Sequence, residues 1–242
     1  MRNYEEETQK RVAFIRRILD ESGAEGIVYG NSGGKDCTLV SILCKMACDR
    51  VTGVIMPCQS GVNYGQDTED ALKVAKQYDI ETVTVDLSEV KKTMTEEISK
   101  VCQISHAASA NIAPRLRMST LYTIAQSKNA LVAGTGNRSE RYMGYFTKWG
   151  DGAFDFNPIA DLTVTEVYEF LRYLNAPASI IEKAPSAGLF EGQTDEKEMG
   201  VTYAQIDAHL NGEEIDAAAE ERINRYHRRS AHKLALPPIY EG

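Results

Sequence analysis

The sequence predicts a single α/β domain with a doubly wound parallel sheet, and three observations lead to this fold. The chain has 242 residues, which suits one large domain better than two. Four short apolar segments, residues 26–30, 51–57, 82–87 and 130–134, have the length and composition of buried strands. Helical patterns separate these segments, and strands that alternate with helices form a parallel sheet covered on both faces. We therefore expect residues 1–242 to fold as one unit.

The helices are identified by their apolar spacing. In the first of them, apolar side chains recur every three or four residues, with charged residues on the other face. Thr163 and Glu166 have the spacing of a capping box, which marks the start of a later helix. The expected helices cover residues 5–19, 38–47, 67–77, 88–101, 115–127 and 164–174, and two more follow towards the C-terminus.

Two long stretches lack periodicity. Residues 135–162 are rich in glycine and aromatic side chains, and residues 185–200 form a second irregular stretch. Long irregular segments inside a compact domain are usually functional. Because ligands bind outside the carboxyl ends of the strands in open α/β sheets, we expect both stretches to converge there with the turn after the first strand.

The composition limits the partners and the compartment. The chain carries 27 basic and 35 acidic side chains, a net charge of −8, which disfavours general binding to nucleic acid or to an anionic membrane. No apolar run approaches the roughly 20 residues of a membrane-spanning helix, and the polar N-terminal segment is unlike a signal peptide. The five cysteines include no C-x-x-C pair, as expected for free thiols in a reducing compartment. These features predict a cytoplasmic protein.

The turn after the first strand, GNSGGKDC at residues 30–37, has the composition of a phosphate-binding loop. Its glycines allow a ligand to approach the backbone, and the helix that follows directs free N–H groups at an anion. The loop fits neither G-x-x-x-x-G-K-[ST] nor G-x-G-x-x-G. Asp36 is unusual there, because a carboxylate repels phosphate unless a cation such as Mg²⁺ lies between them. The alternative is a tight turn in which the helix dipole favours an acidic residue.

This loop resembles the SGG-x-D-S loop of the ATP pyrophosphatases, which split ATP between the α and β phosphates. Further segments resemble one group of these enzymes, the ammonia-dependent NAD synthetases. The resemblance extends over most of the chain from Gly30 to Lys233 and implies a Rossmann-like fold of the adenine-nucleotide α-hydrolase type. The segments are NIAPRLRM (111–118), GTGNRSE (134–140), GYFTKWGDGAFDFNPIADLT (144–163), PSAGLFEGQTDEKEMG (185–200), YAQIDAHL, and the late His232-Lys233 pair.

The resemblance implies a definite reaction. ATP would adenylate the carboxylate of deamido-NAD with release of pyrophosphate, and ammonia would then displace AMP to give NAD. Such chemistry depends on charge neutralisation and positioning more than on a covalent nucleophile. The resemblance further implies Mg²⁺ as cofactor and a homodimer whose interface helps to form the dinucleotide site. Free ammonia, or ammonia from a separate partner, is the implied nitrogen source, because no cysteine is a good candidate for a glutamine-hydrolysing nucleophile.

The resemblance also implies roles for individual residues. Asp36 and Glu140 would bind Mg²⁺, and together with Lys35 they would be the catalytic residues. Arg117 would lie near the deamido-NAD. ATP would be bound by Gly30, Asn31, Ser32, Gly33, Gly34, Lys35, Asp36, Cys37, Thr135 and Ser186. Deamido-NAD would be bound by Arg115, Lys148, Asp155, His232 and Lys233.

Simpler structural roles compete with several of these assignments. Lys148 would otherwise be a surface lysine and Asp155 a turn residue. The arginines at 115 and 117 would lie on the charged face of a helix. His232 and Lys233 would complement the dipole at a basic helix end.

Three positions depart from the family pattern. Cys37 stands where the family usually has serine, and a thiol at a helix N-terminus is expected to have a lowered pKa and to be reactive. Val164 stands where the family usually has a lysine that contacts ATP phosphate, and we hypothesise that Lys35 supplies this cation instead. Pro114 precedes Arg115 and predicts a helix that begins near it.

Two other functions remain open. One is a different ATP pyrophosphatase, which modifies tRNA or forms GMP, although the net charge of −8 and the lack of paired cysteines argue against a tRNA-thiolating enzyme. The other is a nucleotide-binding module without catalysis, which Val164 favours and the two carboxylates Asp36 and Glu140 oppose.

Overall fold

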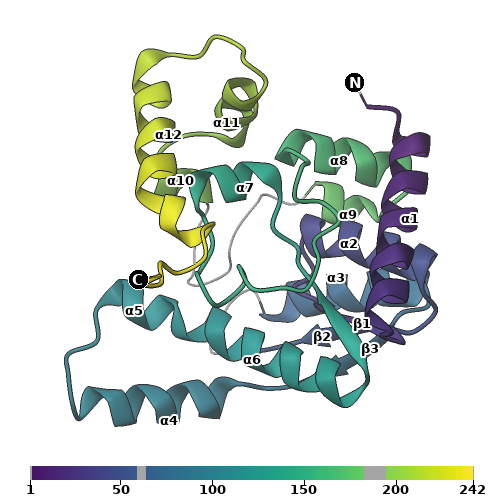
Figure 1. The fold of residues 1–242 in the computed structure, drawn as a ribbon, viewed down its shortest axis with the longest axis horizontal. Coiled ribbons are helices and arrows are strands. Elements are labelled where there is room, and N and C mark those ends of the chain that lie inside the picture. The colour runs from purple at the N-terminus through teal and green to yellow at the C-terminus, as the bar shows by residue number, and fades with distance from the viewer. Residues whose placement is uncertain (1, 59–63, 183–194, 242) are drawn as a thin grey trace.

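The computed structural model describes residues 2–58, 64–182 and 195–241, and its described part contains a four-stranded sheet (Figure 1). The strand order is β3-β2-β1-β4, and every neighbouring pair is parallel. The chain builds outward from β1 through β2 to β3 and then returns to the other side of β1. This topology confirms the predicted α/β fold with a doubly wound parallel sheet. The strands are β1 (Gly26–Gly30), β2 (Val51–Ile55), β3 (Glu81–Thr84) and β4 (Ala130–Ala133).

The helices fill the connections between the strands and most of the chain after β4. None of the helices within the described ranges is long and apolar enough to cross a membrane. They are α1 (Tyr4–Ser22), α2 (Lys35–Ala47), α3 (Tyr64–Gln77), α4 (Ser88–Ser99), α5 (His106–Ala110), α6 (Ile112–Ser127), α7 (Arg138–Met143), α8 (Val164–Tyr173), α9 (Ala178–Ile181), α10 (Asp195–Met199), α11 (Tyr203–Leu210), α12 (Ala217–Ser230) and the 3-10 turn η1 (Ala231–Lys233).

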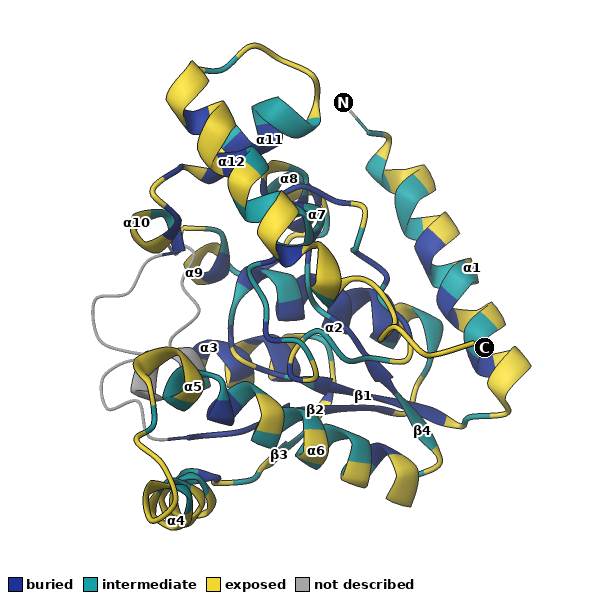
Figure 2. Cartoon of the chain, turned by 60° about the vertical axis from the view of Figure 1, so that its left-hand side comes forward, coloured by how far each residue is buried: buried dark blue, intermediate teal, exposed yellow. Residues whose placement is uncertain are grey.

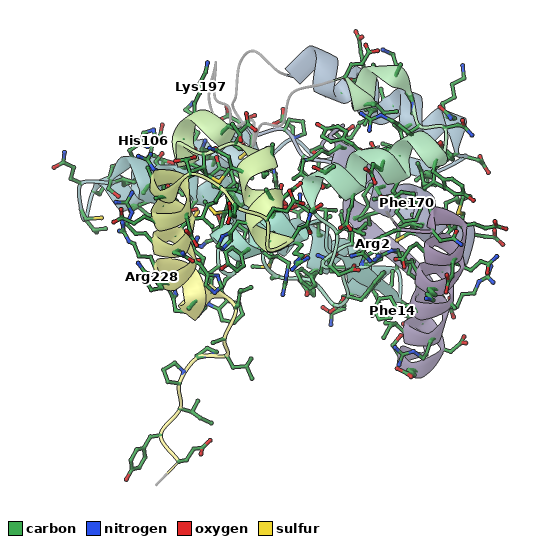
Figure 3. All side chains as sticks on the ribbon, turned by 90° about the horizontal axis from the view of Figure 1, so that it is seen from above. Arg2, Phe14, His106, Phe170, Lys197 and Arg228 are labelled. Carbon is green, nitrogen blue, oxygen red and sulfur yellow. The ribbon has the colours of Figure 1, made fainter. Side chains whose placement is uncertain are left out.

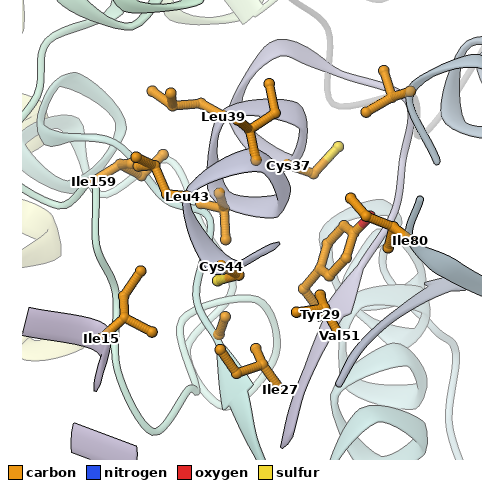
Figure 4. Packing of buried hydrophobic residues seen from close by; sticks show 14 of the residues in the cluster. Ile15, Ile27, Tyr29, Cys37, Leu39, Leu43, Cys44, Val51, Ile80 and Ile159 are labelled. Atoms are coloured by element: carbon orange, nitrogen blue, oxygen red, sulfur yellow. The ribbon is translucent and has the colours of Figure 1, made fainter. Parts of the chain in front are cut away.

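Helices cover both faces of the sheet, because alternate side chains of β1 enter different cores. Ile27 and Tyr29 belong to a large core with residues of α1, α2, α3 and α8 (Figure 4). Val28 belongs to a second core on the opposite face, with residues of β2, β4 and α6. The strands β1 and β2 are therefore buried on both sides. The helix α4, in contrast, lies at the surface and has no buried residue (Figure 2).

A third core joins the C-terminal helices to α7 and α8. Met143, Val164, Tyr203 and Ile223 are among its buried members, and they come from α7, α8, α11 and α12. Val164 thus packs among apolar and aromatic side chains. An apolar residue at position 164 fits this environment, because Val164 is buried and a charged side chain there would be withdrawn from water.

The helix boundaries differ from the prediction mainly where backbone hydrogen bonds decide them. The helix α2 begins at Lys35 rather than residue 38, because extended Gly34 is its N-cap. Pro114 is the third residue of α6, where a missing N–H costs nothing since the first turn has no intrahelical acceptor. The short helices α5, α7, α9 and α10 were not predicted, and α7 and α10 lie within the two stretches that were expected to be irregular. Asn137 and Glu140 form the capping box of α7, a signal that asparagine in place of serine or threonine obscured.

A charged cluster fastens α1 to the loop before α8. Arg11 is buried, and its guanidinium donates to both carboxylate oxygens of Asp161 at 2.6 and 2.9 Å and to Glu7 at 2.6 Å. Arg2 adds hydrogen bonds to Asp161 at 2.9 Å and to Glu166 at 2.7 Å. Arg2, which precedes α1, and Phe14 of α1 lie on the same side of the molecule as Phe170 of α8 (Figure 3). Burial opposes ionisation of Asp161, but the hydrogen bonds and charge of Arg11 outweigh it and lower the pKa of Asp161.

We predict that Asp161→Asn destabilises the protein by about 1.5 kcal/mol, the lower end for a hydrogen bond to a charged group, because Asp161 is half exposed. Urea unfolding at pH 7 measures this loss. A group with a lowered pKa in the folded state stabilises the protein above its unfolded pKa, and this contribution disappears as the pH falls through the folded value. The difference between wild type and variant should therefore shrink below about pH 4.

The matched control is Glu21→Gln, since the Glu21–Arg17 pair is about 60% exposed on both sides. Its loss of stability should stay below about 0.5 kcal/mol. Equal effects of the two substitutions would show that Asp161 does not fasten α1.

Candidate active site

A cavity of about 1170 Å³ opens at the carboxyl ends of β1, β2 and β4. This is the point at which the chain changes from one side of β1 to the other, and open α/β sheets bind ligands at such a point. The opposite wall comes from residues 140–154 and from α12 with the turn after it. The predicted convergence of the 30–37 turn with the first irregular stretch is thereby observed. Of the second stretch, only residues 195–200 are described, and Asp195 and Glu198 also line the cavity.

The turn between β1 and α2 presents backbone N–H groups to this cavity. Asn31 is buried, its N–H donates to the carbonyl of Val54 at 2.9 Å, and its side-chain oxygen accepts from the N–H of Gly33 at 3.3 Å. Gly33 has φ +71°, a left-handed conformation that glycine adopts without strain. No side chain caps the first turn of α2, so its N–H groups favour an anion. Among the predicted ATP-binding residues, the cavity is lined by Gly30, Asn31, Ser32, Gly34, Lys35, Asp36, Cys37 and Thr135, but not by Gly33.

Two carboxylates from distant parts of the sequence meet beside this turn. Asp36 lies in the first turn of α2 and Glu140 in the first turn of α7. Asn137 is fully buried and connects them: its amide donates to Asp36 Oδ1 at 3.0 Å, and its backbone N–H donates to Glu140 Oε2 at 3.1 Å. Glu140 opens onto the cavity but is otherwise surrounded by protein. This burial and the neighbouring Asp36 raise the pKa of Glu140 well above its ordinary value.

Lys35 brings a positive charge to the same place. Its side chain is only 7% exposed, and Nζ donates to Asp36 Oδ2 at 2.6 Å. Nζ also lies 6.0 Å from the ring centre of Tyr168 and 5.7 Å from that of Tyr203. Burial alone would lower the pKa of Lys35, but the charges of Asp36 and Glu140 outweigh it and raise the pKa.

The prediction that Cys37 has a lowered pKa and a reactive thiol is wrong. The side chain is buried in the core below the turn, and Sγ lies 3.4 Å from Ser32 Oγ and donates to the carbonyl of Gly34 at 3.2 Å (Figure 4). Burial raises the pKa of the thiol, and it outweighs the hydrogen bonds that act in the other direction. The prediction considered only the helix N-terminus and not the depth of the side chain.

Three of the predicted dinucleotide-binding residues, Lys148, His232 and Lys233, lie at or near the C-terminal turn η1. Lys233 lines the cavity, where Nζ donates to the carbonyls of Gly144 and Phe146, both at 2.7 Å. Burial lowers the pKa of Lys233. Lys148 is half-buried and donates to the carbonyl of exposed His232 at 2.6 Å, and the side chains of Lys148 and His232 do not line the cavity.

Arg115 and Asp155 lie outside the cavity. Arg115 is exposed on α6, whereas Arg117 lines the cavity and donates to the carbonyl of Met56 at 3.1 Å. The carboxylate of Asp155 accepts from the backbone N–H of Val132 at 2.7 Å and so covers the edge of β4. The other oxygen of Asp155 accepts from the hydroxyl of Tyr122 at 3.3 Å, and its role in binding deamido-NAD stays a prediction. Ser186 lies outside the described residues.

Several cavity-lining residues were not found by sequence reasoning. Arg225 and Arg229 precede Lys233 at intervals of four residues, so a regular spacing of basic residues in the last helix was the available signal. Arg141 and Tyr168 line the cavity as well, but nothing in their local sequence marks them. Within the described residues, no three His, Cys, Asp or Glu side chains are grouped as a metal site.

Comparison with known proteins agrees with this geometry. The NH(3)-dependent NAD(+) synthetase of Carboxydothermus hydrogenoformans is 46% identical over 240 residues, which are 98% of each chain. Among solved structures, NMN synthetase from Francisella tularensis superposes with a TM-score of 0.94 and 40% identity, with both chains covered completely. The NH3-dependent NAD synthetase of Campylobacter jejuni, solved with a nitrate ion, superposes with a TM-score of 0.84 and 30% identity, also with both chains covered completely. Since the sequence model described as NAD synthase matches residues 7–237, the chain belongs to the NAD synthase family.

Proposed function

We propose that the protein amidates deamido-NAD with ammonia at the expense of ATP, which yields NAD, AMP and pyrophosphate. The observation that carries this proposal is the acidic pair Asp36–Glu140 beside the uncapped N-terminus of α2, inside one cavity. Its volume of about 1170 Å³ exceeds the roughly 300–1,000 Å³ of a typical single-ligand pocket and leaves room for two nucleotides.

The residues around the turn suit the phosphates of ATP. The N–H groups of the first turn of α2 would bind the departing pyrophosphate. Lys35 would add a cation to this phosphate site, whereas Val164 lies in the third core and supplies none. Arg117, Arg225 and Arg229 line other parts of the cavity and are suited to the phosphates of the second nucleotide.

Asp36 and Glu140 fit Mg²⁺, which prefers one or two carboxylates and completes its shell with phosphate oxygens and water. Burial first, and then the charge of Asp36, raise the pKa of Glu140, and a divalent cation would relieve the repulsion between the two carboxylates. Bound there, Mg²⁺ would neutralise charge on the transferring phosphates. Asn137 holds both carboxylates in place by hydrogen bonds to one oxygen of each.

The reaction would proceed in two displacements. A carboxylate oxygen of the nicotinate group attacks the α phosphorus of ATP, and the bond to the β phosphate oxygen breaks with loss of pyrophosphate. The nitrogen of ammonia then attacks the acyl carbon and loses a proton, and the bond to AMP breaks. Both steps depend on alignment and on neutralised charge, which the buried site provides.

A second candidate substrate is the corresponding mononucleotide, which carries the same nicotinate carboxylate. The high structural similarity to a protein described as NMN synthetase favours it. Both candidates share the adenylation and amidation steps, and they differ in the AMP half of the dinucleotide, which needs additional binding groups.

We predict that the purified protein, supplied with ATP, Mg²⁺ and ammonium, forms AMP, pyrophosphate and NAD in equal amounts from deamido-NAD. Liquid chromatography of all three products provides the measurement. A parallel reaction with the mononucleotide compares kcat/KM for the two substrates. A higher kcat/KM for the mononucleotide would show that the mononucleotide is the preferred substrate of the same reaction. Binding of ATP without cleavage would favour a non-catalytic module.

Asn137→Ala tests the acidic pair without removing either carboxylate. Losing the two-sided support should lower kcat by about tenfold or more, the equivalent of one good hydrogen bond to a charged group. The lost cap should also cost about 1 kcal/mol of stability. Initial rates at saturating substrate and urea unfolding measure the two effects separately.

Asn3→Ala is the matched control, because Asn3 also caps a helix but α1 does not line the cavity. It should lose stability and keep wild-type kcat. Equal kcat values for the two variants at a temperature where both are folded would contradict the role given to Asn137.

We also propose that the protein works as a homodimer. Val90, Met94 and Val101 are exposed along α4 and the segment after it, at 50, 41 and 82%. Apolar side chains at such spacing on a helix usually face a partner. Exposed Arg115 on the neighbouring α6 would then be able to reach a nucleotide site of the second copy.

Light scattering after size exclusion should give twice the chain mass of 26.8 kDa. Met94→Glu should shift the mass towards the monomer, while Leu72→Glu, an exposed residue of α3, should not. A monomeric wild type would rule out the dimer and leave Arg115 without a ligand.

A further inference from the structure

The contact between Lys35 and Asp36 is not one that helix geometry produces. Consecutive helical residues point about 100° apart and do not face each other. Lys35 nevertheless turns so that Nζ lies 2.6 Å from Asp36 Oδ2, inside a site where only 7% of its side chain is exposed. A long, flexible ammonium side chain adopts this position because the local negative charge attracts it.

The negative charge comes from both carboxylates. The ammonium group of Lys35 is stabilised by Asp36 first and also by Glu140, and the rings of Tyr168 and Tyr203 lie within 6.0 Å of it. The ammonium group of Lys35 thereby offsets the repulsion between two acidic groups that are largely withdrawn from water.

Each carboxylate oxygen of Asp36 already accepts a hydrogen bond, and one of the two donors is a cation. Its Oδ1 accepts from the Asn137 amide, and its Oδ2 accepts from Lys35. Glu140 Oε2 accepts from the backbone N–H of Asn137. A divalent cation at Asp36 Oδ2 would share that oxygen with the buried ammonium of Lys35, and the repulsion between the two positive charges makes them compete for it.

We propose that Lys35 is a built-in substitute for the divalent cation, which holds the acidic pair until metal and nucleotide arrive together. The inference relies on the metal site of the proposed function. Metal alone binds weakly, because the displaced ammonium would be left in a buried place without an acceptor. When ATP is present, its phosphate oxygens accept the ammonium, and the metal takes Asp36 Oδ2. Lys35 thus makes metal binding depend on the nucleotide.

Binding of Mn²⁺ to the full-length protein tests this role, followed by electron paramagnetic resonance with and without α,β-methylene-ATP. In wild type, the analogue should tighten Mn²⁺ binding at least tenfold. Lys35→Met removes the competing cation, so it should bind Mn²⁺ at least tenfold more tightly than wild type without the analogue. The same variant should lose most of the gain that the analogue produces and cleave ATP more slowly.

Two controls make the result specific. Lys45→Met removes a lysine at the far end of the same helix, where it pairs with Asp79, and should bind Mn²⁺ as wild type does. Mn²⁺ should raise the melting temperature of Lys35→Met more than that of wild type, which also shows that the variant is folded.

Asp36→Asn separates this inference from the proposed function. If it abolishes Mn²⁺ binding while Lys35→Met binds no more tightly than wild type, the metal site stands and the substitute role of Lys35 is overturned. If Asp36→Asn binds Mn²⁺ with the analogue as wild type does, the metal site itself is misplaced, and the inference fails with it.

Discussion

The structure depends on holding two carboxylates and one ammonium group together in a place that water hardly reaches. Asp36, Glu140 and Lys35 would be unstable there individually, because an unpaired charge in a low-dielectric site costs several kcal/mol. Together, with Asn137 between them, they form a site in which the ammonium offsets part of the negative charge and hydrogen bonds hold oxygens of both carboxylates. This balance is suited to a reaction in which negative charge moves between phosphates and a carboxylate.

The rest of the fold brings these groups together from distant parts of the chain. Asp36 follows β1, and Glu140 follows β4, the strand beside it in the sheet. The change of direction between those two strands opens the crevice, and the capping box of α7 fixes Glu140 at its rim. The C-terminal helices then close the far wall, anchored by the apolar core around Met143 and Ile223. Arg225, Arg229 and Lys233 on that wall make the cavity suitable for a second phosphate-bearing substrate.

Much of this arrangement could be predicted from the sequence. Buried strands are short apolar runs, and the order of strands and helices restricts the topology, so the sheet and the turn at residues 30–37 were identified correctly. The pairing of Asp36 with Glu140 came from the family resemblance, since no local pattern shows that α7 meets α2. Cys37 shows the limit of a local argument: the helix N-terminus was recognised, but the burial that raises the pKa of the thiol depends on tertiary packing. Asp155 shows another limit, because only the structure reveals that its carboxylate pairs with the edge of β4.

The position of the bound metal tests directly whether Asp36 and Glu140 form the metal site. Crystals grown with Mn²⁺, α,β-methylene-ATP and deamido-NAD would locate it by anomalous diffraction. We expect one peak bound by Asp36, Glu140 and phosphate oxygens, with the ammonium of Lys35 moved from Asp36 to a phosphate. A peak bound to neither carboxylate, or a nucleotide whose phosphates lie away from the first turn of α2, would contradict the account.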